Sequence, residues 1–141
     1  MKRVPNWDVK LVRWAETQFG EPFEWGRTDC GSLIKSGLRL IFGQPVLDEG
    51  LRYKDEESAV GVIRTVGTVA AYFKKLGGER LIPTRAAGGD IVVRPGRDDG
   101  LPRMGLMLHP TGFVTSDPVN GPHVVSKYQL PSRARIYRMD P

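Results

Sequence analysis

Hydrophobic residues in the first half of the chain recur at intervals of three and four residues, which is the period of an amphipathic helix. The first of these sets lies between Pro5-Asn6, a helix start signal, and Gly20, a stop signal. Its members are Trp7, Leu11, Trp14, Ala15 and Phe19. The pattern predicts a first helix that buries this face.

A second set of hydrophobic positions shares one helical face and comprises Cys30, Leu33, Ile34, Gly37, Leu38 and Ile41. Either Thr28 or Asp29 can cap the start of this helix, because both side chains accept hydrogen bonds from free backbone N–H groups. Gly43 and Pro45 end it. Cys30, the only cysteine in the chain, is therefore expected in the first turn of the second helix.

Two shorter helices are predicted next. Asp55 can cap one that runs to about Val66, with its apolar positions turned inward. Thr68 opens another that runs to about Leu76 and closes at Gly77-Gly78. The first half of the chain is therefore expected to be helical throughout.

From Leu81 onward the pattern changes to short apolar or β-branched runs separated by glycine and proline. These runs are DIVVRP, RMGLMLH, GFVTS, HVVSKYQ and RARIYRM. They predict an antiparallel meander in which HPTG (109–112) forms a tight hairpin and GRDDG (96–100) an exposed loop. Helices followed by strands indicate an α+β fold, with N-terminal helices packed on one side of a small C-terminal antiparallel sheet.

Composition and charge narrow the function classes. The 141 residues fit one domain, residues 1–141, of ordinary globular composition. The net charge of +5 suits an anionic polymer such as cell wall, but the basic residues form no dense block, which disfavours nucleic-acid binding. One cysteine and two histidines predict no internal disulfide, metal site or cofactor. The chain shows neither a secretory signal nor a membrane-spanning segment, which predicts a cytoplasmic product.

Cys30 is the main candidate for chemistry. The first turn of a helix offers free N–H groups and the positive end of the helix dipole, and both stabilise a thiolate. Asp29 opposes this effect, because a nearby negative charge raises the pKa of a thiol, unless its carboxylate is engaged in capping or in pairing with Arg27. A free cysteine on an apolar face is also a common packing residue, so a nucleophilic and an inert Cys30 are both open.

The segment PFEWGRTDCGSL (22–33) resembles the nucleophile segment of the NlpC-type cell-wall peptidases, which are cysteine hydrolases with a rearranged papain-like fold. The closer similarity is to an uncharacterised offshoot of that group encoded in phage tail modules. Further matching features are Arg52-Tyr53, Gly89-Asp90 before the sheet and the closing strand RARIYR. The similarity extends from Trp7 to Arg138 and implies a papain-like, NlpC-type fold.

In active members of that family, a histidine stands two residues before a glycine of the strand that follows the Gly-Asp, and a third polar residue lies on the next strand. With Gly105 aligned to that glycine, Arg103 takes the histidine position and Thr115 takes the third polar position. A guanidinium does not lose its proton in proteins, so Arg103 cannot deprotonate Cys30. The resemblance therefore implies an active site without its general base.

The two histidines of the chain are candidates for the missing base. His109 follows Arg103 on the same predicted strand, roughly 20 Å away at ~3.3 Å per residue, which puts it out of reach of Cys30. His123 opens another strand and is kept as a substitute base. The resemblance also assigns Trp25 and Asp29 to substrate binding, although Trp25 is equally well explained as a half-buried core aromatic.

Three functions follow from these observations. The preferred hypothesis is a phage tail-tip or tail-hub protein with a degenerate NlpC-like site, made in the host cytoplasm and carried in the virion tail, with other tail proteins as partners. The second is an active cysteine hydrolase that cleaves peptidoglycan during cell-wall penetration. The third is a small host-directed binding protein. None of these requires a cofactor, nucleic acid or membrane insertion.

Overall fold

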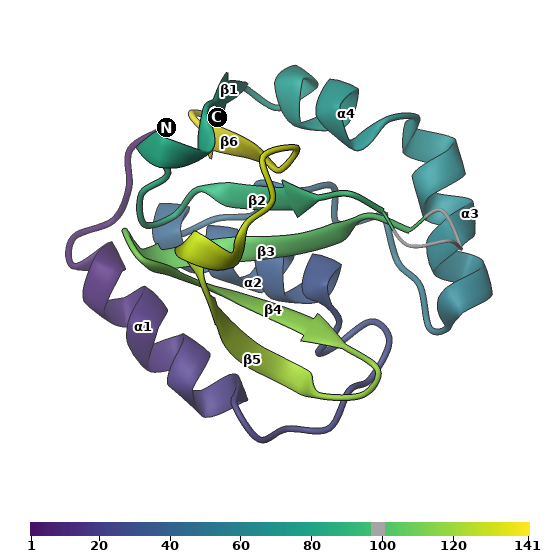
Figure 1. The fold of residues 1–141 in the computed structure, drawn as a ribbon. Coiled ribbons are helices and arrows are strands. Elements are labelled where there is room, and N and C mark those ends of the chain that lie inside the picture. The colour runs from purple at the N-terminus through teal and green to yellow at the C-terminus, as the bar shows by residue number, and fades with distance from the viewer. Residues whose placement is uncertain (97–100) are drawn as a thin grey trace.

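The computed structural model describes residues 1–96 and 101–141. The predicted exposed loop at 96–100 lies outside the described residues, apart from its first glycine. The helices are α1 (Trp7–Gln18), α2 (Cys30–Phe42), α3 (Glu56–Val66) and α4 (Val69–Lys75). The strands are β1 (Gly78–Leu81), β2 (Ile91–Arg94), β3 (Arg103–His109), β4 (Gly112–Asp117), β5 (Gly121–Ser126) and β6 (Arg135–Met139). Helices precede strands along the chain, so the predicted α+β class is confirmed (Figure 1).

Side chains at the helix starts explain where the predicted helices begin. Asp29, and not its neighbour, caps α2 by accepting a hydrogen bond from the backbone N–H of Ser32. Asp55 caps α3 in a capping box with Ser58, in which each side chain accepts from the other's backbone N–H. Thr68 caps α4. Local signals of this kind depend on few neighbours, which is why the sequence predicts these helices well.

The strands form one antiparallel sheet in the order β1-β6-β2-β3-β4-β5. Strands β2 to β5 make the predicted meander, with the hairpin at 109–112. The expected position of β6 is wrong: it does not follow β5 at the edge but returns to lie between β1 and β2 (Figure 1). There it pairs on both sides, with Ile136 opposite Leu81 and opposite Val92. Strand β1, which completes this pairing, is not among the predicted runs.

Each face of the sheet carries a hydrophobic core. On one face, α1, α2 and α4 pack against β2, β3, β4 and β6 (Figure 1). The buried residues of this core are Leu11, Ala15, Leu33, Ile34, Leu38, Ile41, Phe42, Phe73, Ile91, Leu106, Leu108, Val114, Tyr137 and Met139. A smaller core on the other face comprises Leu81, Ala86, Val92, Met107, Phe113 and Ile136. Gly37, in the middle of α2, allows this helix to lie close to β3, because a Cβ there would collide with Leu106.

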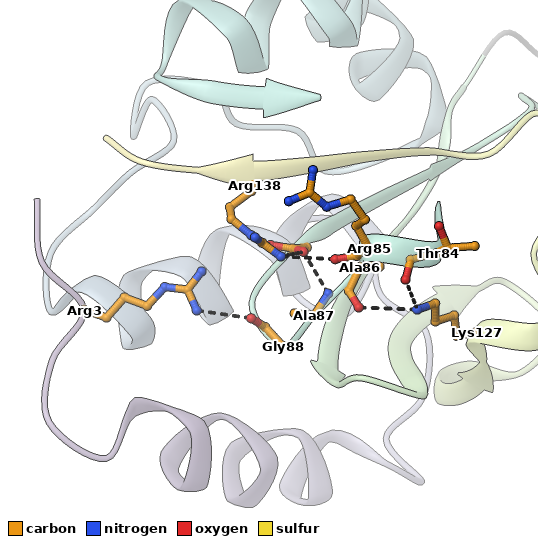
Figure 2. Close-up of polar contacts among 9 residues, drawn as sticks. Arg3, Thr84, Arg85, Ala86, Ala87, Gly88, Lys127 and Arg138 are labelled. Carbon is orange, nitrogen blue, oxygen red and sulfur yellow. Dashed lines mark hydrogen bonds and ion pairs between the residues drawn. The ribbon is translucent and has the colours of Figure 1, made fainter. Parts of the chain in front are cut away.

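The loop before β2 is fastened by a buried carboxylate and by cations from distant parts of the chain. Asp90 is fully buried and accepts hydrogen bonds from the Nε and Nη2 atoms of Arg138 (3.0 and 2.9 Å) and from the N–H of Ala87 (2.8 Å). Lys127 and Arg3 donate to carbonyl groups of the same loop. Figure 2 shows these three cations directed at the loop. Asp90, which directly precedes β2, therefore holds this loop to distant parts of the chain.

Candidate functional site around Cys30

The carboxylate of Asp29 organises the turn that precedes Cys30. Asp29 is 3% exposed, and it accepts hydrogen bonds from the N–H of Gly26 (2.9 Å) and from the N–H and hydroxyl of Ser32 (3.2 and 2.6 Å). The phenolic hydroxyl of Tyr53 donates to the same carboxylate. Because protein donors occupy its oxygens, Asp29 holds the turn and caps the helix that begins at Cys30.

Two glycines allow the segment of Tyr53 to lie against this turn. Gly26 has a φ of +83°, in the left-handed region that favours glycine, and a Cβ there would lie 2.5 Å from the carbonyl oxygen of Tyr53. A Cβ on Gly31 would lie 2.5 Å from the Tyr53 hydroxyl. The packing of Tyr53 therefore requires a glycine at each of these positions, one before Cys30 and one after it.

Cys30 lies in the wall of a cavity of about 120 Å³, formed by the start of α2, by α3 and by the sheet. The structure brings most of the predicted site residues to this cavity. Those that line it are Trp25, Asp29, Cys30, Arg103 and His123. Two residues that the sequence analysis does not single out, Arg94 and Ser116, also line it. Chemistry at Cys30 would therefore take place among these side chains.

Trp25 combines the two interpretations that the sequence leaves open. It lines the cavity, as a groove wall would. Its half-buried ring also packs edge-on against Phe23, with ring centroids 4.9 Å apart, and against Tyr53, with centroids 6.4 Å apart. Aromatic pairs in this edge-to-face geometry stabilise each other beyond their buried area. Trp25 thus joins the wall of the cavity to the turn that Asp29 organises.

The surroundings of Cys30 favour its protonated form. Burial raises the pKa of the Cys30 thiol above its ordinary value, and the negative charge of Asp29 raises it further. Hydrogen bonds from the backbone of Met104 and Gly31, together with the positive charge of Arg94, lower this pKa but do not offset burial. The net shift is upward, so the thiolate is a minor species at neutral pH.

Arg94, which the sequence analysis misses, supplies the positive charge that acts on Cys30. It ends β2 and lies directly opposite Arg103 in the pairing of β2 with β3. Burial lowers the pKa of the Arg94 guanidinium, and the charge of Arg103 lowers it further. The only sequence signal for Arg94 is the arginine that closes the DIVVR run. Its role depends on the register between the two strands, which the sequence does not specify.

Arg103 and Thr115 occupy different surroundings from those implied by the resemblance. Arg103 is exposed at the start of β3, and it is not among the groups that shift the pKa of Cys30. Thr115 is 1% exposed and is not among the residues that line the cavity. Its hydroxyl donates to the carbonyl oxygen of Met104 (2.6 Å) and accepts from Nη2 of Arg94 (3.2 Å). Thr115 therefore positions Arg94 and the strand backbone that contacts Cys30.

The two histidines lie in different cavities. His123, on β5, pairs with Thr115 across the sheet and lines the same cavity as Cys30. Its Nδ1 atom is 2.7 Å from the carbonyl oxygen of Gly121, and its Nε2 atom is 3.8 Å from an oxygen of Asp117. His109 ends β3 and lines a separate cavity beside α1. His123 is therefore the histidine that shares a cavity with the thiol.

A second cavity of about 490 Å³ adjoins the first, between α2, α3 and α4. The residues that line both are Gly31, Tyr53, Val62, Ile63 and Met104.

Within the part of the chain that the structure describes, no group of three His, Cys, Asp or Glu side chains is arranged to hold a metal ion. Among the same residues, no helix has the length and hydrophobicity to cross a membrane.

Comparison with known proteins gives one assignment. None of the curated proteins compared with the chain matches it. One family profile does match, over residues 2–138 of the 141, and its description is a domain of unknown function (DUF6950). The match spans the helices, the whole sheet except the last residue of β6, and every residue of the site around Cys30. The chain therefore belongs to the family described as domain of unknown function DUF6950.

Proposed function

We propose that the chain is a phage tail-tip or tail-hub component of the virion, with an NlpC-type papain-like fold that no longer hydrolyses peptide bonds. Its role is structural, in tail assembly or genome delivery. The fold is supported by the Asp-Cys pair at the start of a helix that packs on an antiparallel sheet. The tail role is supported by the resemblance of the segment 22–33 to proteins of phage tail modules.

The observation that carries the loss of hydrolysis is the set of charges around the thiol. Among the described residues, the charged side chains that shift the pKa of Cys30 are Asp29 and Arg94, and neither is an imidazole. A guanidinium cannot take the thiol proton, and Asp29 is engaged by donors of the protein. Neither of these two side chains can therefore act as the general base for Cys30.

This arrangement blocks two steps of a cysteine hydrolase. The thiol must first lose its proton to a base before its sulfur attacks the peptide carbonyl carbon. The same group must then return a proton to the leaving amine. Since the pKa of Cys30 is raised and Arg94 keeps its proton, neither step has a suitable partner.

The proposal is tested with purified protein and isolated peptidoglycan. The native chain and the Cys30→Ala variant are incubated with the polymer, and newly released amino groups are measured. We expect no release from either, together with detection of the intact chain in purified virions by mass spectrometry. Release by the native chain but not by the variant would overturn the loss of hydrolysis, and absence from particles would overturn the tail role.

A second function, an active peptidoglycan hydrolase, is favoured by the position of His123 in the cavity of Cys30. If Nδ1 donates to the carbonyl of Gly121, Nε2 is the nitrogen free to accept a proton, with Asp117 beside it. This alternative predicts that His123→Ala abolishes release of amino groups. His109→Ala is the matched control, because His109 lies in another cavity.

A further inference from the structure

The cavity of Cys30 contains two buried polar atoms without partners. Nε of Arg94 and the hydroxyl of Ser116 are both enclosed, and neither has a hydrogen-bond partner among the described residues. Buried polar groups are nearly always paired, because an unpaired one costs about 1 to 3 kcal/mol. Both residues line the same cavity of about 120 Å³. Two such groups in one cavity indicate that a ligand supplies the missing acceptor.

The charged side chains that line this cavity are two arginines and two aspartates, and both carboxylates already accept hydrogen bonds from the protein. Arg94 and Arg103 are its cations, and Asp29 and Asp117 are its carboxylates. Asp29 is engaged by the donors of its own turn and by Tyr53. Asp117 accepts from the backbone N–H groups of its own β-turn (2.9 and 2.8 Å).

Arg94 has spare donors in this cavity. Among the described residues its only hydrogen-bond acceptor is Thr115, and no carboxylate lies within ion-pair distance of it. A guanidinium presents five N–H donors in a planar fork, which matches the two oxygens of a carboxylate. The cavity therefore offers a guanidinium that forms no direct ion pair with a carboxylate among the described residues.

The remaining walls indicate a small apolar group attached to the anion. The apolar side chains that line the cavity are Phe23, Trp25, Val62, Ile63, Leu101 and Pro102. Its volume of about 120 Å³ suits a small molecule or the end of a longer one. A carboxylate with one negative charge is less costly to bury between apolar walls than a phosphate with nearly two charges.

We propose that this cavity binds the terminal carboxylate of a small acylated amino acid or of a peptide, with Arg94 and Ser116 as its donors and the apolar walls around the terminal side chain. The inference goes beyond the proposed structural role, and it does not depend on whether the chain hydrolyses peptide bonds. It assigns the cavity a ligand class instead of a reaction. Cys30 lies beside the bound group but takes no part in holding it.

The first test compares N-acetyl-alanine with its primary amide by isothermal titration calorimetry, using the full chain and Cys30→Ala. We expect the acid to bind both proteins equally and the amide to bind at least about tenfold more weakly, because a hydrogen-bonded charge is lost. Equal binding of acid and amide overturns the proposal. So does failure of the acid to bind at concentrations up to about 10 mM, because even weak specific binding has a Kd of about 1 mM.

Variants identify the donors. Arg94→Gln is expected to weaken binding of the acid at least about tenfold, whereas Arg80→Gln, an exposed arginine of β1, leaves it unchanged. Ser116→Ala is expected to weaken it severalfold, with exposed Ser132→Ala as its control. Unchanged affinity in both cavity variants overturns the assignment. If Arg94→Gln fails to fold, Ser116→Ala and the comparison of acid with amide still show whether the cavity binds a carboxylate.

Two further results distinguish a peptide terminus from a free acylated amino acid, and the proposed ligand from the proposed loss of hydrolysis. A tetrapeptide that ends in alanine binds at least as tightly as N-acetyl-alanine if the ligand is a peptide terminus, and more weakly if it is a free acylated amino acid. The hydrolysis assay is independent of this result. Release of amino groups with normal carboxylate binding refutes only the loss of hydrolysis, and lack of binding without release refutes only the ligand.

Discussion

The hydroxyl of Tyr53 donates a hydrogen bond to the Asp29 carboxylate, the group that caps the helix of Cys30. This bond joins two segments that lie far apart in the sequence. Burial raises the pKa of the Tyr53 phenol, and the negative charge of Asp29 raises it further. Tyr53 is therefore a neutral donor, and it fastens its segment to the turn that presents Cys30.

Replacement of Tyr53 by phenylalanine should destabilise the fold. The variant leaves the ring in place but removes the donor to a buried carboxylate, at a cost of about 1.5 to 3 kcal/mol. Urea denaturation followed by circular dichroism measures the free energy of unfolding. Tyr128→Phe is the matched control, because Tyr128 is 82% exposed. Equal stability of the two variants would show that the bond to Asp29 contributes nothing.

The stability of the native protein should fall at alkaline pH. In the unfolded chain the tyrosine phenol loses its proton near pH ~10, whereas in the native state Tyr53 keeps it. The native state then binds more protons, so the free energy of unfolding decreases as pH rises above about 10. The raised pKa of Cys30 acts in the same direction and is removed by working in Cys30→Ala. In that background Tyr53→Phe should flatten the decrease, and an unchanged slope would contradict this account.

Replacement of Gly31 by alanine should strain the site. Its Cβ would lie 2.5 Å from the Tyr53 hydroxyl, and overpacking of this kind costs about 1 to 3 kcal/mol. Gly61→Ala is the control, since a Cβ on Gly61 has no neighbour within 4 Å, and in the helix it should stabilise by about 0.5 to 1 kcal/mol. Thermal or urea unfolding distinguishes the opposite signs of the two changes.

A double variant identifies the source of this strain. In Tyr53→Phe the hydroxyl that opposes the new Cβ is absent, and the next ring atom lies 3.7 Å away. The cost of Gly31→Ala should therefore be smaller in that background than in the native chain. If the free-energy changes of the two single variants simply add in the double variant, the strain does not come from the contact between the new Cβ and the Tyr53 hydroxyl.

The helices could be predicted from the sequence because each depends on neighbours within a few residues. Asp55 with Ser58 at the start of α3 is such a local signal. The position of β6 could not be predicted, because it depends on pairing with β1 and β2 across the chain. The strand GERL (78–81) is short and largely polar, so without its partner β6 it carries no clear periodicity.

Part of the site could also be predicted, because it depends on residues that are close together in the sequence. The Cys30 segment and Trp25 are contiguous in the sequence, and His123 is a candidate base on its residue type alone. Arg94 could not be identified, because its place beside the thiol depends on the register that puts it opposite Arg103. A half-buried arginine at the end of a strand cannot be told from an exposed one by the sequence alone.

The charge of Arg94 should affect the reactivity of Cys30, and that of Arg103 should not. Arg94 lowers the pKa of the thiol, so Arg94→Gln should raise this pKa and slow alkylation by iodoacetamide at every pH below the midpoint. Arg103→Gln should leave the pH profile unchanged, since Arg103 is exposed and is not among the groups that shift it. A larger effect of Arg103 would restore it as the group that acts on the thiol.

Removal of the Asp90 carboxylate should have the largest effect on stability. Asp90→Ala leaves the N–H of Ala87 and the guanidinium of Arg138 without their acceptor in the loop before β2. Loss of one member of a buried, hydrogen-bonded pair costs about 3 kcal/mol or more. Asp8→Ala, in the first turn of α1, serves as the exposed control and should change stability little. Urea denaturation measures both. If the loop were held mainly by Lys127, Asp90→Ala would lower the free energy of unfolding no more than the control does. Lys127→Ala would then cause the larger decrease.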